Sequence, residues 1–497
     1  MVAFLSAISQ RFRKKEASSS SSAESGASYG ATAVVVDGSA NGIVVDEQSS
    51  LLALGNIQQQ QMEAKPKRVA GQDRMIALDV MRGMTIMLMI VVNNQPSRTY
   101  YPLDHAEWFG MTPTDLVFPF FLWVSGYAAG IVFRNEWKSE DISFFPCSEF
   151  WHNIQNYFRK LCGKIDYENL EEGQQIEYVK YLYLIPMRRP LYEVVSKWTK
   201  IIRRSILLFL IGFFFSVLSH LFDFTNVRVM GVLQRIGICY FITSSMLVLI
   251  PWTFIQIVFA LFLQVLYILI TFGLYVPQSE GCATRGVLEP PQCTAEGYID
   301  RLILTQRHTY QQANYDPEGF LSTLSAVTNC YVGVLAFKVA QKAGKDAHKR
   351  LNYWFLLGSG LMISGMLIHY AGLPIGKKLW TTSFAFVSSG IACAFLACIC
   401  FIVDIHQYKK YWTAIFLWTG SNPLVMYVVP TLVAIVMLKI PVTYQGKQSN
   451  LYSAEFRVLF ASWLPIELAS TLHGICYELL FIPLAFLLYW RKIFIKL

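Results

Sequence analysis

Apolar runs of about 20 residues, the length that an α-helix needs to cross a bilayer, recur along the chain after Arg74. Short polar segments separate them. We therefore expect an all-α, polytopic helical membrane protein with about ten transmembrane helices in residues 73–497. The expected spans are residues 75–96, 114–134, 201–222, 230–249, 252–275, 319–340, 351–371, 380–404, 413–438 and 470–490.

Residues 1–72 differ in composition, with a serine run at 18–22, a glutamine run at 58–61 and many small residues. Such a segment buries too little apolar surface to offset the entropy lost on ordering its backbone. We expect a disordered cytosolic tail. Its stretch Glu47-Gln-Ser-Ser-Leu51-Leu52 matches an acidic dileucine signal of endolysosomal membrane proteins, although signals this short also arise by chance.

Only 15% of the residues are charged. The positions of the basic ones indicate how the chain is oriented in the membrane. An even number of spans places both termini on one side of the membrane. Basic residues are concentrated on that side, in the segment before the first span, the loop 135–200, the turn 342–350 and the C-terminus. By the positive-inside rule this side is cytosolic. The loop 277–318 and the turn that contains His105 then face the lumen.

Two cysteines, Cys282 and Cys293, lie in the lumenal loop, whereas the other eight lie in spans or cytosolic segments. An oxidising compartment favours disulfides, so we expect a bridge between these two. No Cys/His cluster has zinc-site spacing, and neither a glycine-rich phosphate loop nor a serine nucleophile elbow occurs in the sequence. We expect no metal and no nucleic-acid partner.

His105 lies in a short polar turn between the first two apolar runs. Imidazole titrates near neutrality, so it can accept a proton, donate one or attack a carbonyl. Asp115 follows in the stretch Thr112-Pro113-Thr114-Asp115, which is typical of a helix start with Thr112 as N-cap and Pro113 at the first helical position. Capping is therefore the favoured role of Asp115, and contact with a substrate is the alternative.

The long lumenal loop contains three further polar candidates, Asp316, Glu318 and His308. Asp316 and Glu318 precede the span that begins near residue 319, where carboxylates stabilise the positive end of a helix. A role in substrate binding is the alternative. His308 is the second histidine candidate.

Polar side chains inside spans are costly and require an explanation. Asp79 and Arg82 are three residues apart on one helix face, so either they pair with each other or one of them meets an anionic ligand at the cytosolic mouth. Asn93 and Asn94 end the first span, as a helix cap or as donors to an oxyanion. Arg235 begins a span from the lumenal side, where snorkelling and a binding role explain it equally well.

Several of these segments together resemble the family of heparan-alpha-glucosaminide N-acetyltransferase, the lysosomal transmembrane acetyltransferase. The similar blocks occur in the family's order and at its approximate spacing, at residues 74–83, 92–93, 105–121, 231–237, 297–302, 316–319 and 379–383. The resemblance runs from about residue 74 to the C-terminus. Human family members carry a lumenal domain and one more span before this region, which we expect this chain to lack, so the acceptor stays open.

The resemblance implies transfer of the acetyl group of cytosolic acetyl-CoA to the amino group of a terminal glucosamine in the lumen of a lysosome or endolysosome. It makes His105 the catalytic histidine, either as general base or as a nucleophile that carries the acetyl group. Asn93 is expected beside the reacting acetyl, with Asn94 as second candidate because one residue is inserted here. The residues expected to contact acetyl-CoA are Asp79, Arg82, Arg235 and Trp108. Membrane lipid and a second copy in a homodimer are further expected partners.

A competing interpretation is a proton-coupled secondary transporter of a small polar solute. Asp79, Arg82, Arg235 and Glu478 would then line a polar path, and His105 would relay protons. No clear repeat relates the first five spans to the second five, which weakens this interpretation. A catalytically silent scaffold of the same family is a third alternative.

Overall fold

The structure, a computed structural model, describes residues 75–134, 191–250, 252–277, 281, 282, 284–344, 346–408 and 411–495. The expected tail 1–72 and most of the expected loop 135–200 lie outside these residues. Within them, nine helices are long and apolar enough to cross a membrane, or ten if one bent pair forms a single span. This confirms a helical polytopic fold with about ten spans.

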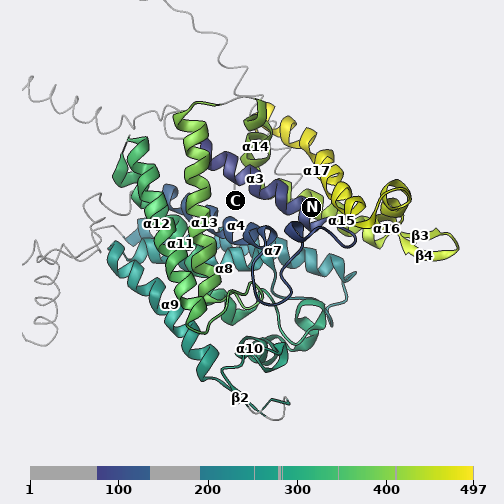
Figure 1. The fold of residues 1–497 in the computed structure, drawn as a ribbon, viewed down its shortest axis with the longest axis horizontal. Coiled ribbons are helices and arrows are strands. Elements are labelled where there is room, and N and C mark those ends of the chain that lie inside the picture. Colours follow the sequence, from purple (N-terminus) through teal and green to yellow (C-terminus); the bar gives the residue numbers. More distant parts are fainter. Residues whose placement is uncertain are drawn as a thin grey trace, which may run out of the picture. The chain divides into compact units, whose positions relative to one another are not determined.

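The spanning helices follow the order of the expected apolar runs (Figure 1). They are α3 (Ile76–Asn93), α4 (Val117–Val132, entered through a short 3-10 turn at Pro113–Leu116), α7 (Leu191–Ser219), α8 (Val232–Leu249), α9 (Thr253–Gly273), α11 (Phe320–Ala343), α12 (Ala347–Tyr370), α13 (Thr382–Cys400, continued by a π-helical turn at Phe401–Ile405) and α17 (Ile466–Trp490). Helix α7 begins at Leu191, ten residues before the expected start at residue 201. The expected span began late because basic residues in the first turns of the helix lower the local hydropathy.

The core lies around α11, which packs against α4 along much of its length. The two helices approach closely because glycines face the partner backbone. A Cβ atom at Gly126 of α4 would lie 1.7 Å from the carbonyl oxygen of Cys330, and one at Gly333 of α11 would lie 1.9 Å from that of Trp123. Small residues of this kind allow helices to pack without a hydrophobic driving force in lipid.

The ninth expected span, 413–438, is not straight. It consists of α14 (Tyr411–Ser421) and α15 (Pro423–Lys439), which meet at an angle of 77°. Proline lacks an N–H and disfavours helical geometry in the residue before it. The break therefore falls at Asn422, whose side chain donates to the carbonyl of Ile493 at 2.9 Å and accepts the N–H of Ile495 at 2.9 Å.

The remaining elements lie between the spans. Helix α10 (Ala295–Leu304) follows a two-stranded antiparallel hairpin, β1 (Tyr275–Val276) and β2 (Thr284–Arg285), in which Tyr275 pairs with Arg285. A second antiparallel hairpin joins β3 (Pro441–Tyr444) to β4 (Lys447–Asn450) and leads into α16 (Leu451–Phe456).

Three loops that the expected topology assigns to the lumen meet one another. The N–H of Gly110 donates to the carbonyl of Ile375 at 2.7 Å, which joins the turn after α3 to the loop between α12 and α13. The indole N–H of Trp108 donates to the carbonyl of Leu288 at 2.9 Å, which joins the same turn to the loop before α11. The candidate residues of these loops therefore lie on one face.

Candidate functional site

His105 lies in the turn between α3 and α4, with its side chain 48% exposed. Its Nδ1 atom is 2.7 Å from Oδ1 of Asp115, a carboxylate that is almost completely buried. The other oxygen of Asp115 accepts the backbone N–H groups of Thr112, at 3.0 Å, and of Ala106, at 3.2 Å. Asp115 therefore caps the helix entry and also binds the His105 ring.

Lys377, from the loop between α12 and α13, completes this cluster. Its Nζ is 3.2 Å from Oδ1 of Asp115 and 3.1 Å from Nδ1 of His105. Nδ1 of His105 cannot donate to the carboxylate and accept from the ammonium group at the same time, because a ring nitrogen carries either a hydrogen or a lone pair. The consistent arrangement has Lys377 and the Nδ1–H of His105 both donating to Asp115, which leaves the lone pair on Nε2.

Burial lowers the pKa of Lys377 below its ordinary value, and the carboxylate of Asp115 opposes only part of this effect. Lys377 was not among the candidate residues predicted from the sequence. A signal was present, because Lys377 and Lys378 form a basic pair in a loop assigned to the lumen, where the positive-inside rule disfavours such residues.

Trp108 lies three residues after His105, and its ring contacts residues of two other loops. Besides its bond to Leu288, its ring makes an edge contact with Tyr315 at a centroid distance of 5.1 Å. Nζ of Lys378 lies 5.6 Å from the centroid of the same ring. Trp108 thus joins the His105 turn to two neighbouring loops, and its contact with acetyl-CoA stays a prediction.

The two asparagines at the end of α3 differ in burial. Asn93 is exposed, whereas Asn94 is buried and donates from Nδ2 to the carbonyl of Ile90 at 2.8 Å. The carbonyl oxygen of Asn94 is 3.0 Å from Nδ1 of His473, a buried residue of α17. Ser470, one turn earlier in α17, bonds to the backbone of Ser97. Helix α17 therefore holds the segment that leads into the His105 turn.

Arg235 is completely buried in the first turn of α8, so it does not snorkel to the surface. One of its terminal nitrogens donates to the carbonyls of Pro317, at 2.9 Å, and Gly319, at 3.3 Å. Its guanidinium also lies 4.9 Å from the ring centroid of Trp380. Among the described residues, its Nε and second terminal nitrogen have no hydrogen-bond partner.

Asp316 and Glu318 both bind Arg228, which was not among the candidate residues predicted from the sequence. The Nε of Arg228 donates to Asp316 at 3.0 Å, and a terminal nitrogen donates to Asp316 at 2.5 Å and to Glu318. Burial disfavours the charged guanidinium, but the two carboxylates outweigh it and raise the pKa of Arg228. His308 has its Nδ1 2.7 Å from the carbonyl oxygen of Val227, which is a structural contact in the same loop region.

Asp79 and Arg82 pair with each other at 3.0 Å, and Arg82 also donates to the carbonyl of Gly420 in α14 at 3.3 Å. At a rise of about 1.5 Å per residue, the 14 residues from Asp79 to Asn93 span about 21 Å along α3. The structure therefore does not bring this pair to the His105 turn. Their contact with acetyl-CoA stays a prediction for the other end of the helix.

Cys282 and Cys293 are joined by a disulfide, with their Cα atoms 5.5 Å apart. In the part of the chain that the structure describes, no group of three or more histidine, cysteine, aspartate or glutamate residues is arranged to hold a metal ion. Glu478 is buried in α17, and neither of its carboxylate oxygens has a hydrogen-bond partner among these residues.

No protein-family model matches the chain. Among curated proteins, it is similar to heparan-alpha-glucosaminide N-acetyltransferase from Homo sapiens, with 28% identity over 405 residues, 71% of this chain and 52% of the relative. The protein of the same name from Mus musculus is 27% identical over 411 residues, 73% of this chain and 54% of the relative. The chain spans about half the length of these relatives. The matches confirm the resemblance that the sequence blocks indicate: over about 72% of its length the chain is similar to heparan-alpha-glucosaminide N-acetyltransferases.

Proposed function

We propose that this chain is a transmembrane N-acetyltransferase that moves the acetyl group of cytosolic acetyl-CoA to the amino group of a terminal glucosamine in the lysosomal or endolysosomal lumen. The observation that carries the proposal is the pairing of His105 with Asp115 in the turn between α3 and α4. The name of the relatives, a glucosaminide N-acetyltransferase, supports N-acetyl transfer as the reaction. A histidine whose Nδ1 is bound by a carboxylate presents Nε2 to a reacting group.

Two proton-balanced routes are available to His105. As general base, Nε2 takes a proton from the glucosamine amine while the nitrogen attacks the thioester carbonyl, and the proton passes to the departing thiolate. As nucleophile, Nε2 attacks the carbonyl and the thiolate leaves. The amine then takes the acetyl group from the imidazole, and the proton that the amine loses passes through the freed Nε2 to the thiolate. In both routes the ring becomes cationic, and Asp115 stabilises that charge at 2.7 Å.

The sidedness of the reaction follows from the proposed topology. The His105 turn contacts two other loops that the same topology assigns to the lumen, which supports a common lumenal face. The Asp79 and Arg82 pair marks the opposite end of α3. The donor can therefore enter from the cytosolic end, so that the charged coenzyme A need not cross the membrane.

Labelled acetyl-CoA and glucosamine supplied to membranes that contain the full chain test the proposal. Wild type should form N-acetylglucosamine, and His105→Ala should lose at least about 100-fold in rate, the usual contribution of a general base. His308→Ala is the matched control, since His308 is a histidine of the same face bound to a backbone carbonyl. Absence of acetyl transfer by wild type, together with flux of a solute, would instead support the transporter.

A further inference from the structure

His473, a buried residue of α17, has both ring nitrogens directed at hydrogen-bond acceptors. Its Nδ1 is 3.0 Å from the carbonyl oxygen of Asn94, at the end of α3. Its Nε2 is 3.2 Å from a carboxylate oxygen of Glu455 in α16. A carbonyl has no hydrogen to donate, and neither has an ionised carboxylate. Both bonds therefore form together only when the ring carries a hydrogen on each nitrogen, or when the carboxyl is protonated.

A neutral imidazole carries a hydrogen on one nitrogen only, so it can make one of these two bonds. The form in which His473 joins α3 to α16 thus holds one more proton than the form in which the joint is open. The stability of the joined form is present at acid pH. It is lost as the pH rises through the range in which imidazole ordinarily releases its proton, at about pH 6.5.

Aromatic side chains enclose the His473 ring on several sides. Their centroids lie 5.2 to 6.1 Å from that of the histidine, and they belong to Tyr452, Phe456, Phe460 and Tyr477. Phe460 lies in the π-helical turn that follows α16, an irregularity that is frequent at functional sites. A ring packed in this way keeps its nitrogens directed at the same two acceptors. Loss of the proton therefore becomes loss of a bond.

Glu455 is the charged group that faces His473. The phenols of Tyr452 and Tyr477 also face the ring, but tyrosine ordinarily stays uncharged below about pH 9. From α3 the ring meets the carbonyl of Asn94, and from the turn after α16 it meets the ring of Phe460. The proton is therefore shared between His473 and Glu455.

Other charged residues of the neighbouring elements lie away from the ring. Arg457, in the turn after α16, and Lys439, in the last turn of α15, are exposed. Glu467 and Glu478 lie six and five residues from His473 on α17, which places them on other faces of a helix with 3.6 residues per turn.

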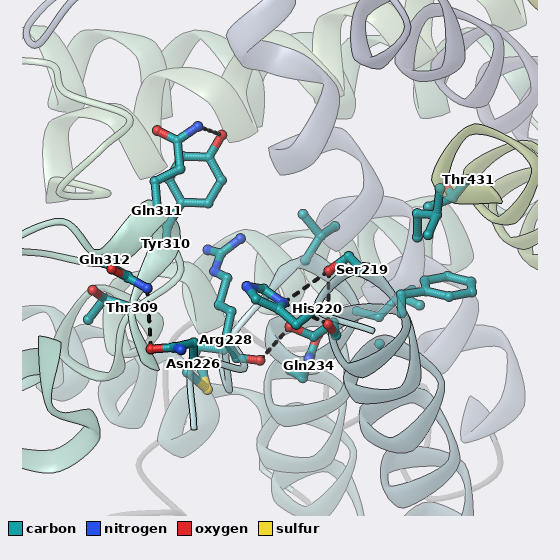
Figure 2. Close-up of a pocket in the computed structure, with 18 of the residues that line it drawn as sticks. Ser219, His220, Asn226, Arg228, Gln234, Thr309, Tyr310, Gln311, Gln312 and Thr431 are labelled. Atoms are coloured by element: carbon teal, nitrogen blue, oxygen red, sulfur yellow. Dashed lines mark hydrogen bonds between the residues drawn. The ribbon is translucent and has the colours of Figure 1, made fainter. Parts of the chain in front are cut away.

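Tyr477 also joins this cluster to α15, because its hydroxyl donates to the carbonyl of Pro430 at 2.8 Å. Thr431, the next residue of α15, lines a cavity of about 580 Å³ that extends to the end of α7 (Figure 2). Neither His473 nor Glu455 is among the residues that line this cavity. The side chain of Glu455 is 29% exposed, whereas that of His473 is 2% exposed. A proton therefore reaches the pair through Glu455.

The end of α3 that His473 binds continues directly into the His105 turn. Ser470, one turn before His473, bonds to the backbone of Ser97 in the same segment. A Cβ atom at Gly474 would lie 2.6 Å from the carbonyl oxygen of Val91, so α17 and α3 are in close contact here. The bonds of His473 extend this contact to α16.

We propose that His473 and Glu455 share a proton that fixes the end of α3, and with it the His105 turn, in an acidic compartment. His473 is a positioning residue in this role, because it acts through the backbone of Asn94. The inference rests on the proposed function and adds its regulation. At pH 5 to 6, where histidine switches are ordinarily protonated, the segment is held, and at neutral pH the joint to α16 opens and acetyl transfer slows.

Glu455→Gln removes the need for the extra proton. Its amide nitrogen can donate to the lone pair of a neutral Nε2 while Nδ1–H donates to Asn94, so both bonds form at neutral pH. Glu455→Ala removes the bond to α16 at every pH. Glu467→Gln is the matched control, because it makes the same chemical change in the first turn of α17.

Hydrogen exchange of residues 451–456 in the purified full chain, followed by mass spectrometry at pH 5.5 and pH 8, measures the joint to α16. Proteins are compared at the same pH, so the pH dependence of intrinsic exchange cancels. At pH 8, wild type and Glu467→Gln should exchange about tenfold faster than Glu455→Gln, as expected on loss of one buried hydrogen bond. At pH 5.5 these three should agree within about twofold, and Glu455→Ala should exchange fast at both pH values. Equal exchange of wild type and Glu455→Gln at pH 8 overturns the shared proton.

Acetyl transfer from labelled acetyl-CoA to glucosamine measures the effect on the His105 turn. The ratio of kcat for Glu455→Gln to kcat for wild type cancels the titration of His105, which both proteins share. This ratio should be about one at pH 5.5 and about ten at pH 8, because displacement of a catalytic group lowers the rate steeply. An equal ratio at both pH values overturns the positioning role. Absence of transfer by every protein contradicts the proposed function, whereas the exchange measurement still decides whether the proton is shared.

Discussion

The two carboxylate oxygens of Asp115 face different groups. Oδ2 accepts backbone N–H groups at the helix entry, whereas Oδ1 faces His105 and Lys377. A helix cap is common in any protein, so capping alone would say nothing about chemistry. The second oxygen is what gives this cap a direct effect on the imidazole.

Asp115→Asn tests this effect. The amide oxygen is expected to take the position of Oδ2, because the N–H groups of Thr112 and Ala106 require an acceptor. The NH₂ group then faces His105, so Nδ1 must accept and the proton moves to Nε2. We expect kcat to fall by about 100-fold or more, as on loss of a general base. Asp104→Asn is the control, since the Asp104 carboxylate accepts the backbone N–H of His105 and does not bind the ring. A rate near that of wild type at an unchanged melting temperature would rule out this role.

Lys377→Met tests the contribution of the lysine to the cluster. Nζ of Lys377 lies within 3.2 Å of both Oδ1 of Asp115 and Nδ1 of His105, so its loss should leave the ring less firmly positioned. We expect kcat to fall by about tenfold or more, because a misplaced catalytic group lowers the rate steeply. Lys378→Met is the matched control, because Lys378 lies over Trp108 and not at His105. A kcat of Lys377→Met equal to that of wild type would contradict this role.

For single residues, the sequence predicts contacts between neighbours along the chain but not contacts between distant segments. His105 and Asp115 are ten residues apart, and the apolar runs that flank them already indicate a helix start beside a polar turn. Lys377 is 272 residues from His105, so only the packing of α13 against α4, with the contact of the loop before α13 to the His105 turn, reveals it. Arg228 was missed for the same reason, since its carboxylate partners lie 88 and 90 residues away.

Among the elements, the bend between α14 and α15 shows where hydropathy is insufficient. Both halves of residues 413–438 are apolar, so the mean hydropathy in a window moved along the sequence predicts one straight span. The Asn422-Pro423 pair was a signal for a break, but the sequence alone does not show that Asn422 binds the C-terminal segment.

Asn422→Ala should destabilise the protein, because it leaves the carbonyl of Ile493 and the N–H of Ile495 without partners. Each unsatisfied buried group costs about 1 to 3 kcal/mol, so the apparent melting temperature should fall. Deletion of residues 493–497 removes the same bonds from the other side. The two changes should therefore be non-additive when combined. Full additivity would show that Asn422 acts through other contacts.

Helix α10 and the start of α11 share one buried carboxylate, Asp300. It accepts the N–H groups of Asp316, at 3.1 Å, and Phe320, at 3.0 Å. Burial nevertheless raises its pKa from 3.8 to about 7. Between these two pH values the folded chain holds a proton that the unfolded chain releases. Asp300 therefore contributes stability that is fully present below about pH 4 and is lost as the pH rises to about 7.

The apparent melting temperature of wild type should accordingly fall between pH 5 and pH 7.5, and Asp300→Asn should show a smaller slope. The variant should also be less stable at every pH, since its amide lacks one acceptor. Asp223→Asn is the control, because hydrogen bonds from Thr225 and Asn226 lower the pKa of this exposed aspartate. An unchanged slope in Asp300→Asn would show that another group titrates.

For the whole molecule, the membrane topology depends on whether the bent pair of helices, α14 and α15, crosses the membrane or re-enters it. If α14 and α15 together cross the membrane, the β3–β4 hairpin lies on the side opposite to Tyr411, and α17 returns the chain to the side of Tyr411. If the pair re-enters, the hairpin lies on the side of Tyr411 and the C-terminus on the other side. The apolar pattern gives both helices but not this choice, because their lengths of 11 and 17 residues fit either arrangement.

An epitope inserted between Gln445 and Gly446, at the exposed tip of the hairpin, distinguishes the two cases. A second epitope follows Leu497. In sealed lysosomal vesicles treated with protease from the cytosolic side, the C-terminal epitope should be lost and the hairpin epitope protected. Detergent should expose both, which controls for resistance of the epitope itself. Loss of the hairpin epitope with protection of the C-terminal one would make the pair re-entrant and reduce the span count to nine. The even count that places both termini in the cytosol would then fail, and the assignment of His105 to the lumen would rest on the basic residues alone.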